Sequence, residues 1–265
     1  MGAPTPEAPG QHHRVPGRRR ADRARAVADV LRRQIHDGRF TTGALPGEPA
    51  LGSEFAASRN TVREALALLR DEGLVERVPR LGTLVSGRKY DHGLDRLSGL
   101  NETLHTHGPV HNAVRLAQET AAPPGVARRL GLTEGAPVVH IERLRLLGGR
   151  PVSLDLTYLA PDVGLPLLEQ DLEHNDVFAL IAGVCGHRLG PAEVSLEAVN
   201  ADPHSASVLH TPPGAALLLM ERLTRLDGGR PVDLEYIRLR GDRITMSGRL
   251  DGPVPPIHHP TDTRR

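Results

Sequence analysis

The hexapeptide SRNTVR, which begins at Ser58, brings together two hydroxyls, an amide and two guanidinium groups. An arginine side chain suits the O6 and N7 atoms of guanine, and an asparagine side chain suits adenine. Ser58 is a good N-cap, because its hydroxyl can accept a free backbone N–H at the start of a helix. Arg59, Asn60, Thr61 and Arg63 would then lie on the first turns, where a recognition helix meets base edges and phosphates. The chemistry that this stretch predicts is the reading of DNA bases.

Three helical patterns would position these side chains. In the first, apolar residues recur every four positions and the run stops at Gly38. Pro49 falls near the start of the second, where its missing N–H costs little. The third begins after Ser58, shows one apolar face and closes at Gly73. The apolar positions are Val27, Leu31 and Ile35 in the first, Leu51 and Phe55 in the second, and Val62, Ala65, Leu66 and Leu69 in the third.

Two short apolar runs follow, Leu74-Val75 and Thr83-Leu84-Val85, with residues 79–82 between them as a hairpin tip. Three helices and such a hairpin are the layout of a winged helix-turn-helix, which lays one helix in the major groove of DNA. The alternative is a three-helix domain whose arginines are merely solvated. The agreement of order, spacing, caps and wing favours DNA binding. The candidate DNA-contacting residues are Glu48, Arg59, Asn60, Thr61, Arg63, Arg80, Gly82 and Thr83.

The segment 21–86 resembles the DNA-binding domain of the GntR family of bacterial transcription regulators. The resemblance implies that Arg59, Thr61 and Arg63 contact operator DNA and that the wing approaches the minor groove. Arg80 and Leu81 depart from the family pattern by making a larger wing tip, and Gly47 stands where serine is usual, which would remove one phosphate contact. The matching residues are Leu45-Pro46 with Glu48, Ser58-Arg59, Thr61-Val62-Arg63, Ala65-Leu66, Gly73-Leu74-Val75 and Gly82-Thr83.

The charge of the chain is divided along its length. Residues 1–90 carry 16 Lys and Arg against 10 Asp and Glu, a net charge of +6. Residues 91–265 carry 17 Lys and Arg against 22 Asp and Glu, a net charge of −5. The overall charge of +1 therefore hides a basic N-terminal front and an acidic C-terminal back. A basic front attracts phosphates through counterion release, and an acidic back fits a partner domain that stays off the DNA.

A length of 265 residues favours two domains. We expect a disordered basic arm at 1–20, the winged helix-turn-helix at 21–87, a linker at 88–106, an effector-binding domain at 107–250 and a disordered tail at 251–265. No apolar run approaches 18 residues and the start has no apolar signal-peptide core, so neither a membrane span nor a secretory leader is expected. The single cysteine, Cys185, suits a reducing cytoplasm. We expect its side chain to fill space in an apolar core and not to act as a thiol sensor.

The second half contains an internal repeat. Residues 135–159 return as residues 214–239, with one inserted residue, Asp227. Each copy has a β-like run, a Gly-Gly turn and a second run that begins with Arg-Pro-Val, which predicts a β-hairpin. Between and around the hairpins we expect short helices at 126–130, 177–181 and 205–209, a loop or turn at 163–168 and a strand at 194–199. Hairpins interleaved with helices predict an α+β fold with an antiparallel sheet.

Residues 107–250 resemble the UTRA domain of the HutC branch of the GntR family. The resemblance implies a fold related to chorismate lyase, a bound small-molecule effector that is coupled to DNA affinity, and a homodimer. The matching residues are Ala127 with Leu130, Arg143 and Arg145, Gly149 with Pro151-Val152, Tyr158-Leu159, Pro231-Val232 and Gly241-Asp242-Arg243.

The resemblance also implies where the effector binds. Members that hold phosphorylated sugars use arginines of the first hairpin, which match Arg143 and Arg145, and a serine at the start of the middle helix. That serine position corresponds to Asp176, whose charge would repel phosphate. We therefore expect a less anionic effector, with an amine or hydroxyl groups. The candidate effector residues are Arg143, Arg145, Asp155, Asp176, Asp233 and Glu235.

Arg143 also has a purely structural explanation, a salt bridge with Glu142 or Asp155. That explanation stays open, because Arg222 occupies the equivalent position of the second copy without an obvious ligand role. The histidines at 105, 107 and 111 have no spacing that fits a metal site, and no cofactor is implied.

The sequence thus predicts a cytoplasmic, nucleoid-associated regulator, most simply a repressor. Its partners would be a palindromic double-stranded operator, a small-molecule effector and a second copy of the chain, without a membrane. Two alternatives remain: a DNA-binding regulator that has lost its effector, and an enzyme related to chorismate lyase. The enzyme is disfavoured because we find no nucleophile elbow, phosphate loop or metal set.

Overall fold

The structure is a computed structural model that describes residues 16–87 and 89–250. The chain divides into two compact units, unit 1 from Met1 to Lys89 and unit 2 from Tyr90 to Arg265. The expected C-terminal tail at 251–265, and the expected N-terminal arm up to residue 15, lie outside the described residues. The last five residues of that arm, 16–20, form the start of the first helix.

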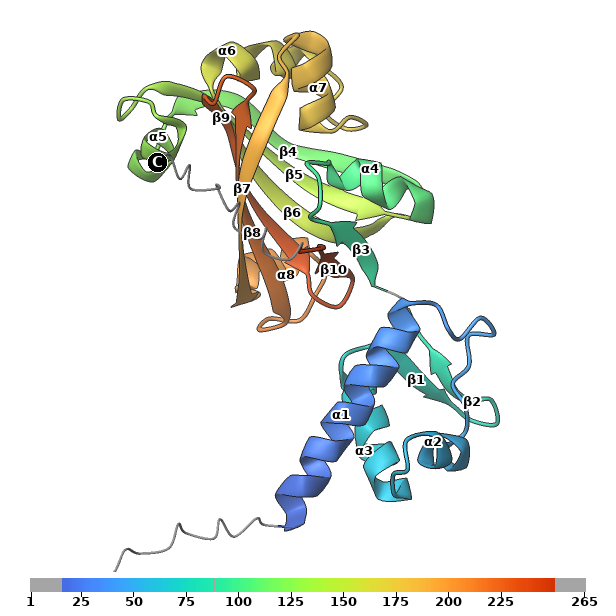
Figure 1. Ribbon diagram of the computed structural model, residues 1–265. Helices are drawn as coiled ribbons and strands as arrows, with labels where there is room; N and C mark the ends of the chain where they lie inside the picture. The colour runs from blue at the N-terminus through green and yellow to red at the C-terminus, as the bar shows by residue number, and fades with distance from the viewer. Residues whose placement is uncertain (1–15, 88, 251–265) are drawn as a thin grey trace, which may run out of the picture. The chain divides into compact units, whose positions relative to one another are not determined.

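Unit 1 is a winged helix-turn-helix (Figure 1), which confirms the predicted fold of this segment. Its elements are α1 (Pro16–His36), α2 (Glu48–Glu54), α3 (Arg59–Asp71), β1 (Val75–Val78) and β2 (Gly82–Val85). The stops predicted for the first and third helices are also confirmed. Gly38 and Gly73 take the left-handed φ values of +74° and +71° that glycine adopts without strain just beyond a helix end.

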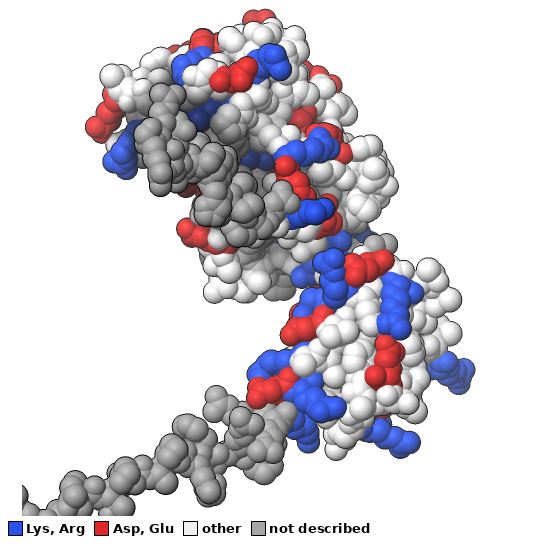
Figure 2. Space-filling model, viewed as in Figure 1, with Lys and Arg blue, Asp and Glu red and all other residues white. Residues whose placement is uncertain are grey.

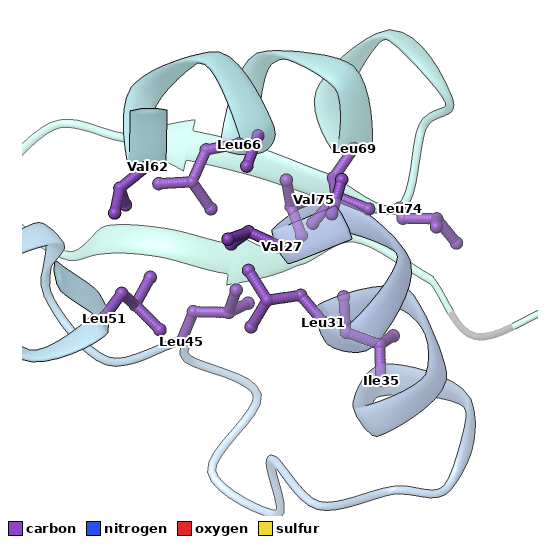
Figure 3. Close-up of a cluster of buried hydrophobic side chains, with 12 residues drawn as sticks. Val27, Leu31, Ile35, Leu45, Leu51, Val62, Leu66, Leu69, Leu74 and Val75 are labelled. Carbon is purple, nitrogen blue, oxygen red and sulfur yellow. The ribbon is translucent and has the colours of Figure 1, made fainter. Parts of the chain in front are cut away.

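The core of unit 1 is the set of apolar side chains that the helical spacing singled out (Figure 3). Val27 and Leu31 of α1 face Val62 and Leu66 of α3, and Leu51 of α2 closes the cluster. Each of these side chains is buried, because residues three and four apart share one helix face. This packing fixes α3 by its apolar face and leaves the opposite face free.

The wing is the antiparallel hairpin of β1 and β2, in which Val75 pairs with Val85 and Val78 pairs with Gly82. Its turn is tight, since Arg80 and Gly82 both have positive φ, +69° and +94°. Ala44 adds an isolated bridge to Leu84 on the other side of β2. Strand β2 is therefore held from both sides.

Unit 2 is built on a six-stranded antiparallel sheet with the order β4-β5-β6-β9-β8-β7. The two repeated hairpins, β5–β6 and β8–β9, form its centre and meet where β6 pairs with β9. The antiparallel sheet and the duplicated hairpins confirm the predicted fold class. The strands are β4 (Val110–Ala121), β5 (Pro137–Leu147), β6 (Arg150–Leu159), β7 (Leu189–Asn200), β8 (Ala216–Leu226) and β9 (Pro231–Arg240).

Helices connect these strands. They are α5 (Pro124–Leu130), α6 (Pro161–Gly164), the 3-10 helix η2 (Leu165–Glu169), α7 (Val177–Val184) and α8 (Pro203–Val208). The expected loop at 163–168 is wrong: Pro161 and Pro166 stand in the first turns of α6 and η2, where proline favours a helix start. Val163 and Leu167 are buried there with Ile181 of α7 against the sheet.

The segment expected as a linker carries regular structure within unit 2. It holds β3 (Tyr90–Gly93), α4 (Leu100–Leu104) and the start of the 3-10 helix η1 (His105–His107). β3 pairs in parallel with the late strand β10 (Ile244–Ser247). Leu100 and Leu104 are buried with Ile237 and Leu239 of β9. Among the described residues of this stretch, Leu100 and Leu104 are buried against the sheet and Tyr90 is partly buried beside them, which is too few apolar positions for a clear period.

Alternation along the central strands turns one set of polar side chains to a common face. Arg143 of β5 lies opposite Asp155 of β6, and Arg222 of β8 lies opposite Glu235 of β9. Thr157 of β6 lies opposite the same Glu235. A single strip across four strands therefore carries charged groups inside the fold.

None of the helices that the structure describes is both long enough and apolar enough to span a membrane.

Candidate functional site

The start of α3 is organised as the sequence predicted. The Ser58 hydroxyl accepts the backbone N–H of Thr61 at 3.2 Å, which caps the helix. Arg59, Asn60 and Arg63 are exposed on its first turns. Thr61 differs from the expectation, because its side chain is 97% buried in unit 1 (3% exposed) and its hydroxyl lies 2.8 Å from that of Ser58. Thr61 thus belongs to the cap and offers DNA little surface.

Glu48 holds the arginines of this surface in place. Its carboxylate lies 2.7 Å from Nε of Arg63 and 3.7 Å from Nη1 of Arg77 on β1. The Arg63 side chain stays 62% exposed in this pair. A hollow of about 210 Å³ between α3 and the wing is lined by these three residues together with Arg70 and Thr83. An acidic group would repel phosphate, and here the Glu48 carboxylate holds the Arg63 side chain at this surface.

The wing adds further polar surface. Arg80 and Gly82 are exposed, Thr83 is half-buried, and the Leu81 side chain at the tip is 67% exposed. Figure 2 shows Lys and Arg side chains distributed over the visible face of unit 1, with fewer Asp and Glu between them. The arrangement fits contacts to phosphates from several elements at once.

In unit 2 the polar strip of the sheet forms the floor of a small cavity. Its free volume is about 10 Å³, room for about one water molecule. Four of the six predicted effector residues meet there: Arg143, Arg145, Asp176 and Glu235. The other lining residues are Gly99 and Leu100 beside α4, Val177 and Phe178 of α7, and Arg222 and Ile237 of the second hairpin.

Arg145 is the centre of a buried ion-pair network. It donates to Asp155 at 3.0 Å and to Asp176 at 3.0 Å, and its side chain is 3% exposed. Ser153 donates to the second oxygen of Asp155 at 2.6 Å. Burial alone would lower the pKa of Arg145, but Asp155 and Asp176 together raise it above its ordinary value. This arginine is therefore held permanently charged.

Arg143 lies beside this network without a carboxylate of its own. Its Nη1 donates to the backbone carbonyls of Asn175 at 3.1 Å and Leu172 at 3.4 Å, and its buried Nε has no partner among the described residues. Burial, followed by the charge of Arg145, lowers its pKa. The proposed salt bridge of Arg143 with Glu142 or Asp155 is wrong, because Glu142 pairs with Arg115 on β4 and Asp155 pairs with Arg145.

Arg222 is a cavity residue that is not among the six predicted effector residues. It donates to Glu235 at 2.7 Å and to the backbone carbonyl of Ser98 at 3.3 Å, and its guanidinium carbon lies 4.4 Å from the centre of the Phe178 ring. The signal that could have found it is the repeat itself, because Arg222 is the counterpart of Arg143. The contacts from Phe178 and Ser98 have no sequence signal.

Asp233 does not line the cavity, although it lies on the same face of β9 as Glu235. It is fully buried, it lies opposite Thr224 of β8, and neither of its oxygens has a well-formed hydrogen bond to a described residue. Burial and the nearby Glu235 raise the pKa of Asp233 well above 3.8, so it holds a proton more readily than an exposed carboxyl.

A second, larger cavity of about 310 Å³ adjoins Arg222. It lies between the β3–α4 segment and strands β7 and β8 and is lined by Leu94, Leu97, Val194 and Met220, among others. His92 is buried at its edge, and burial, followed by the charges of Arg222 and Arg145, lowers its pKa to about 4. The two cavities share Arg222, so the polar floor continues from the smaller space into the larger one.

An N-terminal winged helix-turn-helix followed by a sheet domain with a buried arginine cavity defines a class, the DNA-binding regulators that carry a sensory domain. Comparison with known proteins places the chain within it. Residues 23–85 match the family described as "Bacterial regulatory proteins, gntR family", and residues 107–245 match the UTRA domain. The chain belongs to the gntR family of bacterial regulatory proteins, with a UTRA domain as its effector-binding part. This confirms the predicted family and the predicted function of a DNA-binding transcription regulator.

Relatives extend over most of the chain. The HTH-type transcriptional repressor NagR of Bacillus subtilis is 26% identical over 85% of this chain and 93% of its own length. The histidine utilization repressor of Pseudomonas putida is 28% identical over 84% of this chain and 90% of its own. The crystal structure of PhnF from Mycobacterium smegmatis has the same fold, with a TM-score of 0.63 at 24% identity over 86% of this chain and 100% of that one.

Proposed function

We propose that this chain is a homodimeric repressor that binds a palindromic operator and changes its operator affinity when a small molecule enters the cavity of unit 2. One observation carries the proposal. The same chain has a capped recognition helix with Arg63 exposed and a buried arginine, Arg143, whose Nε has no acceptor within the described part of the chain. The first is suited to DNA, and the second is suited to a ligand that supplies the missing acceptor.

On the DNA side, Arg59, Asn60 and Arg63 would contact base edges and phosphates, and Glu48 would set the position of Arg63. The wing would contribute Arg80, Gly82 and Thr83 near the minor groove. Two copies related by a two-fold axis would read half-sites about one helical turn apart, roughly 34 Å. Names of relatives such as NagR and the histidine utilization repressor favour repression over activation. The chain would act in the bacterial cytoplasm, at the nucleoid.

On the effector side, Arg143, Arg145, Asp176 and Glu235 would surround the ligand. Asp155 would act through Arg145, whose charge it balances. The present space, about 10 Å³, is too small for a metabolite, so ligand binding requires movement of the groups that line it. Such a movement would be coupled to operator affinity by about 1–3 kcal/mol.

The first experiment is operator selection from random DNA with the purified full-length protein, followed by binding titrations of variants. Arg63→Ala should lower operator affinity by about 1–3 kcal/mol, because it removes a base or phosphate contact. The matched control is Arg33→Ala on α1, whose exposed side chain pairs with Asp37 and should leave affinity unchanged. Equal binding by Arg63→Ala and the wild type would contradict the recognition-helix assignment. One chain per operator in sedimentation analysis would contradict the dimer.

A further inference from the structure

Asp176 does something unusual for a residue at the start of a helix. It is the N-cap residue of α7, yet its side chain makes no hydrogen bond to the N–H groups of α7. The carboxylate turns away from its own helix into the cavity. There it accepts from Nη1 of Arg145 at 3.0 Å and lies 3.2 Å from the backbone N–H of Glu102 and 3.4 Å from that of Asn101. An intramolecular carboxylate thus sits on one cationic and two amide donors.

The fold leaves room for this carboxylate at one particular point. A side chain at Gly99 would overlap both the carboxylate oxygen and the carbon of Asp176. Gly99 has an ordinary negative φ of −76°, so glycine is required here by close approach and not by backbone conformation. The contact joins α7 to the segment before α4 over 77 positions in the sequence. The absence of a side chain at Gly99 is therefore what allows the Asp176 carboxylate to occupy this position.

A second observation points to a ligand beside it. Arg143 is 1% exposed, lines the same cavity and has a buried Nε without an acceptor among the described residues. Asp155 and Asp176 are both engaged with Arg145. The cavity therefore has two arginines, Arg145 and Arg222, that pair with carboxylates of the chain, and a third, Arg143, whose Nε has no acceptor among the described residues.

We propose that Asp176 is an internal ligand, whose carboxylate fills an oxyanion subsite formed by Arg145 and the N–H groups of Asn101 and Glu102. The intact chain rejects external oxyanions at that subsite, because the resident group is held there at a high effective concentration. An effector can use only the remaining part of the cavity, at Arg143. Specificity against phosphorylated and other strongly anionic ligands is thus set by Asp176. The inference rests on the proposal that this cavity is the effector site, but its test needs no effector.

The test is chemical rescue of the full-length protein with inorganic phosphate. Asp176→Ala removes the internal ligand, so the variant should bind phosphate in a saturable way by titration calorimetry, and the wild type should not. The thermal midpoint of the variant should fall without phosphate. At ten times the dissociation constant of phosphate it should rise by about 3–6 °C. Should Asp176→Ala fail to fold, Asp176→Ser gives the same test, because serine is itself a good N-cap.

Two control variants separate the proposal from general salt effects. Asp176→Asn fills the same space without the charge, so it should not bind phosphate. Asp202→Ala removes a different cap carboxylate, which accepts from the N–H groups of His204 and Ser205 at 2.9 and 3.0 Å without an arginine partner. It should show no phosphate rescue.

Phosphate binding to the wild type, or its absence from folded Asp176→Ala and Asp176→Ser, would overturn the proposal. Equal rescue of Asp202→Ala would also overturn it, by assigning the effect to salt. Operator binding of the same variants without phosphate reports on unit 1 separately, so a failed repressor assignment and a failed subsite assignment give different results.

Discussion

The two hairpins of unit 2 carry the same arginine in different electrostatic settings. In the second, Arg222 pairs with Glu235 directly across the strands at 2.7 Å. In the first, Arg143 lies opposite Asp155 in the same way, but that carboxylate bonds to Arg145 two residues further on. The second copy has a threonine, Thr224, at the position of Arg145.

One additional arginine therefore diverts the carboxylate and leaves Arg143 without a counter-ion. A duplicated structural element can acquire a ligand site in this way. In the second hairpin, Arg222 and Glu235 neutralise each other, and Arg222 also bonds the sheet to the β3–α4 segment through Ser98. The unpaired group in the first is free to bind something else.

The largest predicted effect is on stability. Arg222→Met would leave Glu235 buried beside Asp233 without a positive partner, and breaking such a pair costs about 3–5 kcal/mol. Arg143→Met removes a buried charge that has no carboxylate, so it should cost about 1 kcal/mol or less, while abolishing any response to the effector. The measurement is urea unfolding followed by tyrosine fluorescence. The chain has no tryptophan, and all three tyrosines, Tyr90, Tyr158 and Tyr236, lie in unit 2.

Equal losses for the two methionine variants would contradict the comparison, because they would make Arg143 as structural as Arg222. A loss of operator binding by Arg143→Met without effector would also contradict it. The unfolding experiment therefore separates a structural arginine from a ligand-binding one.

The contrast between the hairpins also shows what the sequence could reveal. Local features were predictable: the Ser58 cap, the apolar face of α3 and the Gly-Gly turns all depend on residues within a few positions. The matching of Arg143 and Arg145 to a ligand role came from resemblance. Partner choice was not predictable, because Asp155 could equally have paired with either arginine across the same strand pair.

Other parts of the site depend on contacts between distant segments. Asp176 meets Asn101 and Glu102 across about 75 positions of sequence, and Arg222 meets Ser98 across 124. No periodicity carries such a contact. The same applies to the segment 88–106, where β3 exists because it pairs with β10 more than 150 residues later. Its short strand has too few residues to show a pattern of its own.

A smaller effect is predicted where the first hairpin has Ser153 and the second has Asp233. Ser153 donates to Asp155 at 2.6 Å, whereas Asp233 has no well-formed hydrogen bond. Asp233→Ser would place a hydroxyl beside Glu235 and make the second copy resemble the first. At neutral pH it should stabilise unit 2 by about 1–2 kcal/mol, because it removes a buried carboxyl without a partner.

The pH dependence gives the sign of this effect. Burial raises the folded-state pKa of Asp233 above its ordinary value of 3.8, so the folded protein binds the proton more tightly than the unfolded chain. The resulting stabilisation is complete below the ordinary pKa and is lost as pH rises through the raised one. Urea unfolding from about pH 5 to about pH 8 should show the wild type losing stability relative to Asp233→Ser. Parallel curves would mean that Asp233 titrates in the same way in both states.

The smallest predicted effect concerns Thr157, whose counterpart in the second copy is Ile237. The Thr157 hydroxyl is buried with no partner among the described residues, between Glu235 and Ile141. Thr157→Val keeps the shape and removes the unsatisfied group, so the free energy of unfolding should stay equal or rise by up to about 1 kcal/mol. A fall in the free energy of unfolding by more than about 1 kcal/mol would show that the Thr157 hydroxyl is hydrogen-bonded in the free protein, for example to a water held between Arg143 and Asp233. The polar strip of the first hairpin would then be part of the fold, and the difference between the two copies would lie in hydration and not in ligand binding.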